Sequence, residues 1–189
     1  MNKPETIPTL TTARLRLRPF SLDDVDEVTA YCQDWEYVRS TAAVPWPYAK
    51  SDAISWIQSH PQSYADDVDW TFALERRNDN TLVGAVSLRP ALQHRRGEIG
   101  YGIYRPFWNN GYATEAAGAL VELGFDMLGL ERIESHYFAC NPASGRVMEK
   151  LGMVREGVMR RHVRRLDQTH DTIHYALLRS EYTPPAERT

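Results

Sequence analysis

The sequence has few cysteines, little net charge and no long apolar run. Its two cysteines, Cys32 and Cys140, are too few and too far apart for a disulfide framework or a cysteine-rich metal site. No apolar stretch approaches the ~20 residues that a helix needs to span a bilayer. The first ten residues, MNKPETIPTL, lack the apolar core of a secretory signal. We therefore expect a cytoplasmic protein with no membrane partner.

The formal net charge of −3 argues against nucleic acid as a direct partner. The basic run Arg160–Arg165 is the exception, and its alternation is typical of a solvated strand face. His162, His170 and His174 have no companions at metal-ligand spacing, so we expect no metal. With 42% hydrophobic and 25% charged residues, the 189-residue chain suits a single globular domain over residues 1–189.

Hydrophobic periodicity predicts an α/β fold with a mixed sheet. Strands are expected at residues 14–20, 69–75, 81–88, 97–104, 132–138, 153–163 and 169–178. Helices are expected after the caps Ser21 and Ser51, as far as Cys32 and Ser59, and at residues 112–128 and 143–151. Residues 76–80 should form the turn of a hairpin between the second and third strands.

The stretch RPFWNNGYATEA, residues 105–116, places a glycine between a strand and a helix. The first turn of a helix leaves about four backbone N–H groups without intrahelical partners, and it attracts anions. Small side chains at Gly111 and Ala113 would let a phosphate approach this backbone, and Asn109 and Asn110 tolerate left-handed conformations. From these residues alone, a tight strand-to-helix turn without a ligand is an equal alternative.

WNNGYATEA resembles the pyrophosphate loop of the GNAT superfamily of acetyl-CoA-dependent N-acetyltransferases, although Trp108 replaces its first residue. The resemblance is closest to the RimJ/RimL-type branch, which acetylates ribosomal-protein N-termini. It extends over residues 11–183 through RLRLRP, PWPYAKSDAISWI, GEIGYGIY and NPASGRVMEKLGMVREG. It implies a mostly antiparallel central sheet flanked by helices, in which the parallel strands 97–104 and 132–138 splay apart. Two departures, Asn109 for the usual glycine and Gly102 for a bulky residue, leave the pocket shape open.

The resemblance also implies a binding site for acetyl-CoA, which serves as co-substrate. Its pyrophosphate would lie on the backbone of residues 109–114. The expected contacts are Ile103, Tyr104, Trp108, Asn109, Asn110, Gly111, Tyr112, Ala113, Thr114, Asn141 and Ser144.

Two residues carry the expected chemistry. Strand alternation places Glu98, Gly100 and Gly102 on one face, and the two glycines leave open space beside the carboxylate. The resemblance implies that Glu98 is the general base, although a surface carboxylate is an alternative. It also implies that Ser144 donates to the departing thiolate, whereas helix capping would explain Asn141 and Ser144 equally well.

The acceptor site is expected around Trp46, Tyr48, Glu98 and His136, although Trp46 and Tyr48 also suit a packing loop and His136 a structural role. An N-terminal α-amine, with a pKa of ~7.8, is neutral about 400-fold more often than an alkyl amine at ~10.4. This favours a protein or peptide N-terminus attacking acetyl-CoA directly in a ternary complex. The alternatives are a small amine (an amino acid, polyamine or antibiotic) and a non-catalytic acyl-CoA-binding module. The resemblance further implies a homodimer, for which Trp46, Trp56 and Tyr48 would supply apolar surface.

Overall fold

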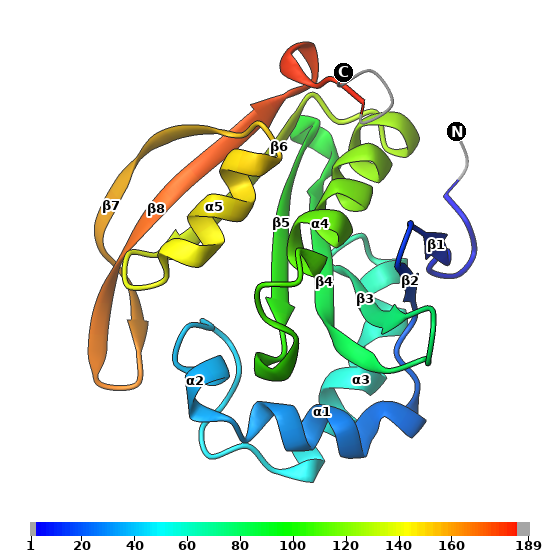
Figure 1. The fold of residues 1–189 in the computed structure, drawn as a ribbon. Helices are drawn as coiled ribbons and strands as arrows, with labels where there is room; N and C mark the ends of the chain where they lie inside the picture. Colours follow the sequence, from blue (N-terminus) through cyan, green and yellow to red (C-terminus); the bar gives the residue numbers. More distant parts are fainter. Residues whose placement is uncertain (1–2, 185–189) are drawn as a thin grey trace.

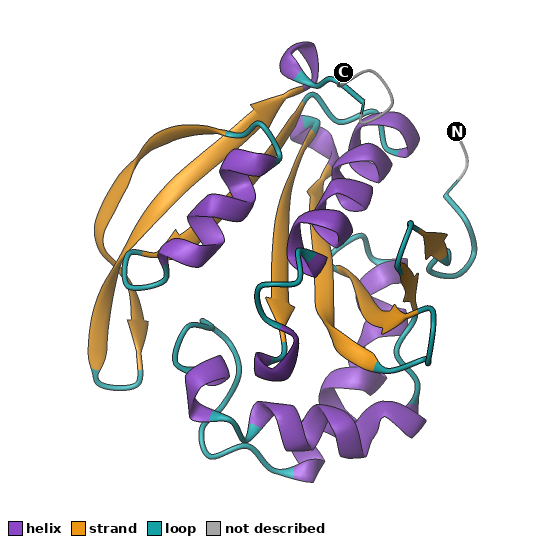
Figure 2. Cartoon of the chain, in the orientation of Figure 1, coloured by secondary structure: helices purple, strands orange, loops and turns teal. Residues whose placement is uncertain are grey.

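The computed structural model describes residues 3–184, in which eight strands form one sheet in the order β1-β2-β3-β4-β5-β6-β8-β7 (Figures 1 and 2). The strands are β1 (Leu10–Thr11), β2 (Leu15–Arg18), β3 (Trp70–Arg76), β4 (Leu82–Ala91), β5 (Arg96–Ile103), β6 (Arg132–Phe138), β7 (Val154–Arg165) and β8 (Gln168–Leu178). The pairings are antiparallel except between β5 and β6, which run parallel. The predicted fold class is confirmed.

Helices cover both faces of this sheet (Figure 1). The α-helices are α1 (Val25–Cys32), α2 (Trp35–Val38), α3 (Lys50–Ala65), α4 (Tyr112–Glu122) and α5 (Pro142–Lys150). Short 3₁₀ turns are η1 (Leu22–Asp24), η2 (Leu92–His94), η3 (Arg105–Phe107) and η5 (Arg179–Glu181), and η4 (Leu123–Met127) is a π-helical turn that continues α4.

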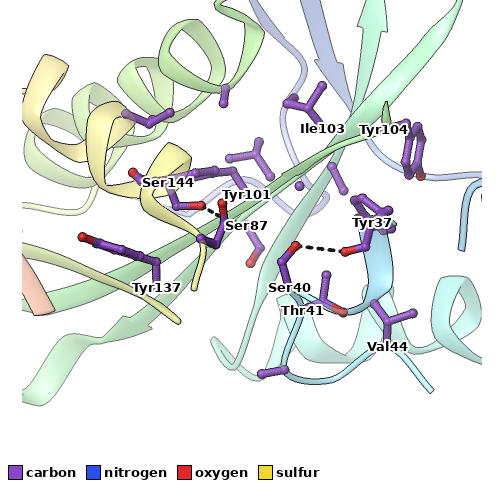
Figure 3. Close-up of a pocket in the computed structure, with 18 of the residues that line it drawn as sticks. Tyr37, Ser40, Thr41, Val44, Ser87, Tyr101, Ile103, Tyr104, Tyr137 and Ser144 are labelled. Carbon is purple, nitrogen blue, oxygen red and sulfur yellow. Dashed lines mark hydrogen bonds between the residues drawn. The ribbon is translucent and has the colours of Figure 1, made fainter. Parts of the chain in front are cut away.

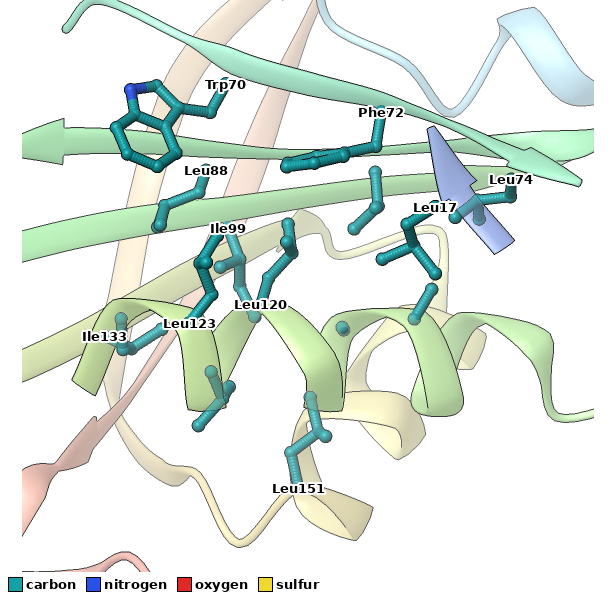
Figure 4. Packing of buried hydrophobic residues seen from close by; sticks show 14 of the residues in the cluster. Leu17, Trp70, Phe72, Leu74, Leu88, Ile99, Leu120, Leu123, Ile133 and Leu151 are labelled. Carbon is teal, nitrogen blue, oxygen red and sulfur yellow. The ribbon is translucent and has the colours of Figure 1, made fainter. Parts of the chain in front are cut away.

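Strand alternation separates two hydrophobic clusters. On the face of α4 and α5, Trp70, Phe72 and Leu74 of β3 share a cluster with Leu120 of α4, and Leu151 joins it from the side of α4 away from β3 (Figure 4). The other cluster joins Ala73, from the opposite face of β3, to residues of α1, α2 and α3, and it includes Tyr104. Side chains from both layers thus hold β4 and β5 in the middle of the molecule.

Several predicted boundaries were wrong. The short elements β1 and α2 carry too little periodic sequence to be recognised. Helix α3 is longer than predicted because it continues through Pro61, and it begins after Ala49 rather than Ser51. The Asp52 carboxylate accepts the Ala49 N–H at 2.7 Å, so the third helical residue, and not Ser51, makes the capping contact. The segment after Ser21 begins as the 3₁₀ turn η1 before it becomes α1.

Strands β5 and β6 remain together over only a short length. Their register pairs Arg96 with Arg132, Gly97 with Ile133, and Glu98 with Glu134. Beyond this point each strand continues for several residues without a parallel partner. The backbones therefore diverge from Glu98 onwards, and this divergence creates the site described next.

Candidate active site

A cavity of about 820 Å³ opens where β5 and β6 diverge. One wall comes from β6 and α5, and the opposite wall comes from α2 and the loop that follows it (Figure 3). Strand β5 and the loop before α4 form the floor between them. Of the predicted site residues, the lining includes Tyr48, Glu98, Ile103, Tyr104, Trp108, Asn109, Gly111, Tyr112, Ala113, Thr114, His136, Asn141 and Ser144.

The glycine-containing loop has the backbone geometry of a helix-start anion site. Gly111 is the N-cap of α4 and adopts a left-handed conformation, with φ 79°. Asn109 is also left-handed, with φ 62°. A Cβ at Gly111 would meet only the Arg14 Nη2 atom, at 3.4 Å, so the backbone is accessible. The first N–H groups of α4 therefore fit the pyrophosphate of acetyl-CoA.

Arg14 braces this loop, a role that sequence reasoning missed. Its Nη1 donates to the Asn110 carbonyl at 2.8 Å, and its Nε donates to Glu115 at 2.7 Å. Thr12 also donates to Glu115, at 2.6 Å. Burial would raise the pKa of Glu115, but the bonds from Thr12 and Arg14 outweigh it and lower that pKa. This acid in the first turn of α4 therefore stays ionised but is paired with Arg14, so that its charge opposes a bound phosphate less.

Glu98 and His136 form a pair across β5 and β6. The His136 Nδ1 atom lies 3.1 Å from Glu98 Oε1. Arg89 approaches the same oxygen at 3.7 Å while binding Asp69 at 3.0 Å. The hydrogen bond from His136 lowers the pKa of Glu98 against the effect of burial, and the charges of His136 and Arg89 lower it further. Glu98 is therefore an ionised partner of an imidazole, and a weaker base than an isolated carboxylate.

Asn141 and Ser144 meet at the start of α5. The Asn141 Nδ2 donates to Ser144 Oγ at 3.1 Å, although Asn141 makes no side-chain cap bond to the helix backbone. Tyr101 donates its hydroxyl to the Ser144 carbonyl at 2.8 Å, and burial raises the pKa of that hydroxyl. Because Ser144 Oγ accepts from Asn141, its own hydrogen can serve a group in the cavity.

The remaining predicted residues are placed differently. The Tyr104 side chain is 1% exposed and stacks on Tyr31 at 3.9 Å, so only a small part of it faces the cavity. Asn110 holds the loop by donating to the carbonyls of Phe107 and Trp108. Tyr48 is buried and lines the cavity, whereas Trp46 lies outside the lining and packs on Trp35 with ring centroids 5.1 Å apart.

The space at Gly102 is filled, in contrast to the sequence expectation. A Cβ there would lie 2.5 Å from the Tyr37 hydroxyl oxygen, so the phenol of α2 occupies the volume that a larger residue would take. Gly100 is less crowded, since a Cβ there would meet Ser87 Oγ at 3.5 Å. The open space beside Glu98 thus lies at Gly100.

Sequence reasoning also missed Tyr37, Ser87, Arg89 and Tyr101 as parts of the cavity wall. Tyr101 alternates with the predicted face of β5, and its place beside α5 follows from the strand divergence. The other three come from α2 and β4, and no local motif marks them. Ser87 stands opposite Gly100 in the antiparallel register, so correct strand pairing would have found it.

Within residues 3–184, histidine, cysteine and acidic side chains form no group of three or more that suits a metal ion. The described helices include none with the length and apolar character of a membrane span.

Comparison with known proteins identifies the family of this chain. Residues 14–154 match the family described as Acetyltransferase (GNAT) domain. A Bacillus subtilis relative, named uncharacterized N-acetyltransferase YoaA, is 34% identical over 91% of this chain and 97% of its own length. A GNAT acetyltransferase structure from Bacillus anthracis has a TM-score of 0.82 at 27% identity, covering 92% of this chain and all of its own.

The fold is also that of RimL, a ribosomal L7/L12 alpha-N-protein acetyltransferase solved with coenzyme A. It superposes with a TM-score of 0.80 at 18% identity, covering 92% of this chain and 97% of RimL. GNAT acetyltransferases use acetyl-CoA as co-substrate, and the accessible Gly111 backbone at the start of α4 fits its pyrophosphate. The chain belongs to the GNAT family of acetyltransferases, and it is an N-acetyltransferase.

Proposed function

We propose that the protein acetylates the N-terminal α-amine of a protein or peptide by direct attack on acetyl-CoA in a ternary complex. One observation carries this proposal: the Glu98–His136 pair shares a single cavity with the Gly111 backbone and Ser144. A proton acceptor, an anion site and a hydroxyl donor thus surround one space. Holding the amine and the thioester together there supplies much of the rate.

In this proposal the Glu98–His136 pair is the general base. The expectation that Glu98 acts alone suits the geometry less well, because its lowered pKa weakens it as a proton acceptor. An imidazole is better matched to an amine near neutral pH. Glu98 accepts the Nδ1–H of His136, orients the ring and stabilises the imidazolium after the proton arrives. The two groups take up that proton as a unit.

Acetyl-CoA supplies the activated acetyl group, and residues of this chain position it. We assign the pyrophosphate to the first turn of α4, behind Gly111, and the thioester sulfur to the hydroxyl of Ser144. Ile103, Trp108 and Asn141 line the same cavity. A hydroxyl suffices at the sulfur, because a thiol with a pKa of ~8.5 needs only modest help to depart near neutral pH.

The acceptor class is inferred from amine chemistry and the shape of the site. A base of moderate strength favours an α-amine, because with a pKa of ~7.8 about a third of it is already neutral near pH 7.5. Ser40, Thr41 and Val44 of the loop after α2 form the cavity wall beside which we place the extended chain end. RimL, whose fold is shared, is itself an α-N-protein acetyltransferase. These points support membership of the RimJ/RimL-type branch.

An acceptor panel tests this function. Purified protein is incubated with acetyl-CoA and with short peptides that have a free α-amine, the same peptides with a blocked N-terminus, free amino acids and polyamines. Mass spectrometry locates the acetyl group. Acetylation of the free α-amine supports the proposal. Faster transfer to a free amino acid or polyamine would replace the acceptor class, and binding without turnover on any amine would indicate an acyl-CoA-binding module.

A further inference from the structure

Three histidines from neighbouring strands gather beside Glu98. His136 of β6 and His174 of β8 are stacked, with ring centroids 5.0 Å apart and planes inclined by 16°. His162 of β7 packs against the edge of this stack, 5.4 Å from the His174 ring. The proposed base uses only His136, which leaves the other two rings without a role.

A buried hydroxyl fixes the second ring. Thr172 has no exposed surface, and its Oγ1 lies 2.8 Å from both His174 Nε2 and His162 Nδ1. When both rings are neutral, a hydroxyl can donate to one ring nitrogen and accept from the other. This bridge fixes the ring plane of His174. The stacking contact between the two rings then constrains the orientation of His136.

The surrounding charges decide whether the stacked ring is neutral. Burial comes first in lowering the pKa of His174, and the imidazoles of His136 and His162 add to it. Glu98 and Glu134 oppose this effect without reversing it. His174 is therefore neutral near pH 7.

The charged groups around His136 differ from those around His174. Glu98 faces it directly, and Arg89 lies behind that carboxylate at 3.7 Å. Glu156 of β7 lies near His174 and is held by Arg132 at 2.5 Å, so its charge is already paired. Glu98 is thus the carboxylate in direct contact with His136, and Arg89 is its more distant second partner.

We propose that His174, held by the Thr172 bridge to His162, is a positioning residue that fixes the ring of His136 for proton transfer. Its catalytic consequence rests on the proposed function. The acceptor R–NH₃⁺ gives one proton to the Glu98–His136 pair, the amine nitrogen bonds to the thioester carbon, and the C–S bond breaks. The thiolate takes the second proton from nitrogen, and the pair then releases its proton to solvent. A neutral stacked ring at position 174 holds His136 in place without repelling that proton.

The test compares His174→Ala with His174→Phe in the full chain, using a short peptide with a free α-amine. Loss of the stack should remove part of the ~10²–10⁴-fold assistance of a general base, so we expect His174→Ala to lower kcat about 10-fold. The KM for acetyl-CoA should not change. Phenylalanine keeps a neutral stacked ring but loses the bond to Thr172, so it should restore only part of the lost kcat.

A matched control and a second variant address stability. His170 lies on the same strand and also stacks, on Phe138 at 4.8 Å, but outside the cluster. His170→Ala should leave kcat per folded molecule unchanged. Thr172→Val, which is nearly isosteric, should lower kcat in the same direction as His174→Ala. Equal losses in the His170, His174→Ala and His174→Phe variants would overturn the inference, as would a fully active His174→Ala protein.

A readout without turnover separates this inference from the proposed function. Imidazole ¹⁵N spectra of the free protein should show one tautomer of His136, protonated at Nδ1, in wild type and His174→Phe. In His174→Ala the spectra should show a mixture. An unchanged tautomer in His174→Ala refutes the positioning role. Absence of peptide acetylation by the wild type, with the tautomer result intact, refutes only the proposed function.

Discussion

The carboxylate of Glu98 and the imidazole of His136 meet across the parallel strands β5 and β6, with Oε1 3.1 Å from Nδ1. The contact lies at the end of the paired region, since Glu98 opposite Glu134 is the last register pair before the strands part. Strand divergence and the proposed base therefore share one location in the fold.

Replacing Glu98 by glutamine tests the base. Glu98→Gln keeps the shape but removes the charge that orients His136, so kcat should fall by ~10²–10³ with the KM for acetyl-CoA unchanged. Glu131→Gln is the matched control, because Glu131 pairs with exposed Arg95 and lies outside the cavity lining. Steady-state kinetics from pH 6 to 9 provide the measurement. Near wild-type activity of Glu98→Gln across that range would remove Glu98 from the mechanism.

The pyrophosphate assignment is tested at Gly111. Gly111→Val adds a side chain where phosphate must approach, and we expect acetyl-CoA affinity to fall at least ~10-fold, about 1.4 kcal/mol. It also forces a β-branched residue to a positive φ. Gly129→Val controls for that strain, because Gly129 has φ 63° and nothing lies within 4 Å of its Cβ position. Titration calorimetry and melting curves on both variants separate the effects. Equal acetyl-CoA affinities in the two variants would contradict the assignment.

Sequence reasoning found the parts of the site that local motifs specify. The Gly111 turn, the Glu98 strand and the Asn141–Ser144 segment all line the cavity, because each depends on residues close together in the chain. Arg14, Arg89 and Tyr37 were missed, because strand pairing and helix packing bring them to the site from distant positions. Trp46 lies outside the cavity since it packs on Trp35, a contact that no pattern in the loop predicts.

Element boundaries follow the same rule. Strong alternation located the long strands, whereas β1 is only two residues long and is defined by its pairing with β2. The continuation of α3 through Pro61 depends on the packing of His60 and Tyr64, which are both buried. Tertiary contacts thus set the element boundaries that local propensity does not specify.

Ser144→Ala tests the help given to the departing thiolate. A hydrogen bond that strengthens as charge develops contributes ~1.5–3 kcal/mol, so kcat should fall roughly 10- to 150-fold with little change in acetyl-CoA affinity. Ser59→Ala, which removes an exposed helix hydroxyl that donates to the Trp56 carbonyl, is the control. Melting temperature and single-turnover rate are measured on both variants. A destabilised but fully active Ser144→Ala protein would leave the serine a purely structural role.

The homodimer stays a prediction. The sequence suggested Trp46, Trp56 and Tyr48 as interface surface, but Tyr48 is buried within the chain. Trp35 and Trp46 are the large apolar side chains exposed in this region, at 41% and 38%. Light scattering at micromolar concentration should give about twice 21.7 kDa, and Trp35→Ser with Trp46→Ser should shift it to monomer. A wild-type mass of one chain would refute the dimer.

His60 should make folding stability depend on pH. Burial lowers the pKa of this ring from 6.5 to about 4, with a smaller opposing effect from Asp69. Neither ring nitrogen makes a hydrogen bond within residues 3–184. The unfolded chain therefore binds a proton below pH 6.5 that the folded chain takes up only near pH 4, so the stability present above pH 6.5 is lost as the pH falls towards 4. Between pH 7 and pH 5 this amounts to about 2 kcal/mol.

His60→Leu should abolish that part of the pH dependence and be neutral or stabilising at pH 5, because it removes a buried polar group without a partner. Urea unfolding at both pH values provides the measurement, with exposed His94→Gln as the control. If His60→Leu loses as much stability as wild type between pH 7 and pH 5, the ring is not held neutral by burial.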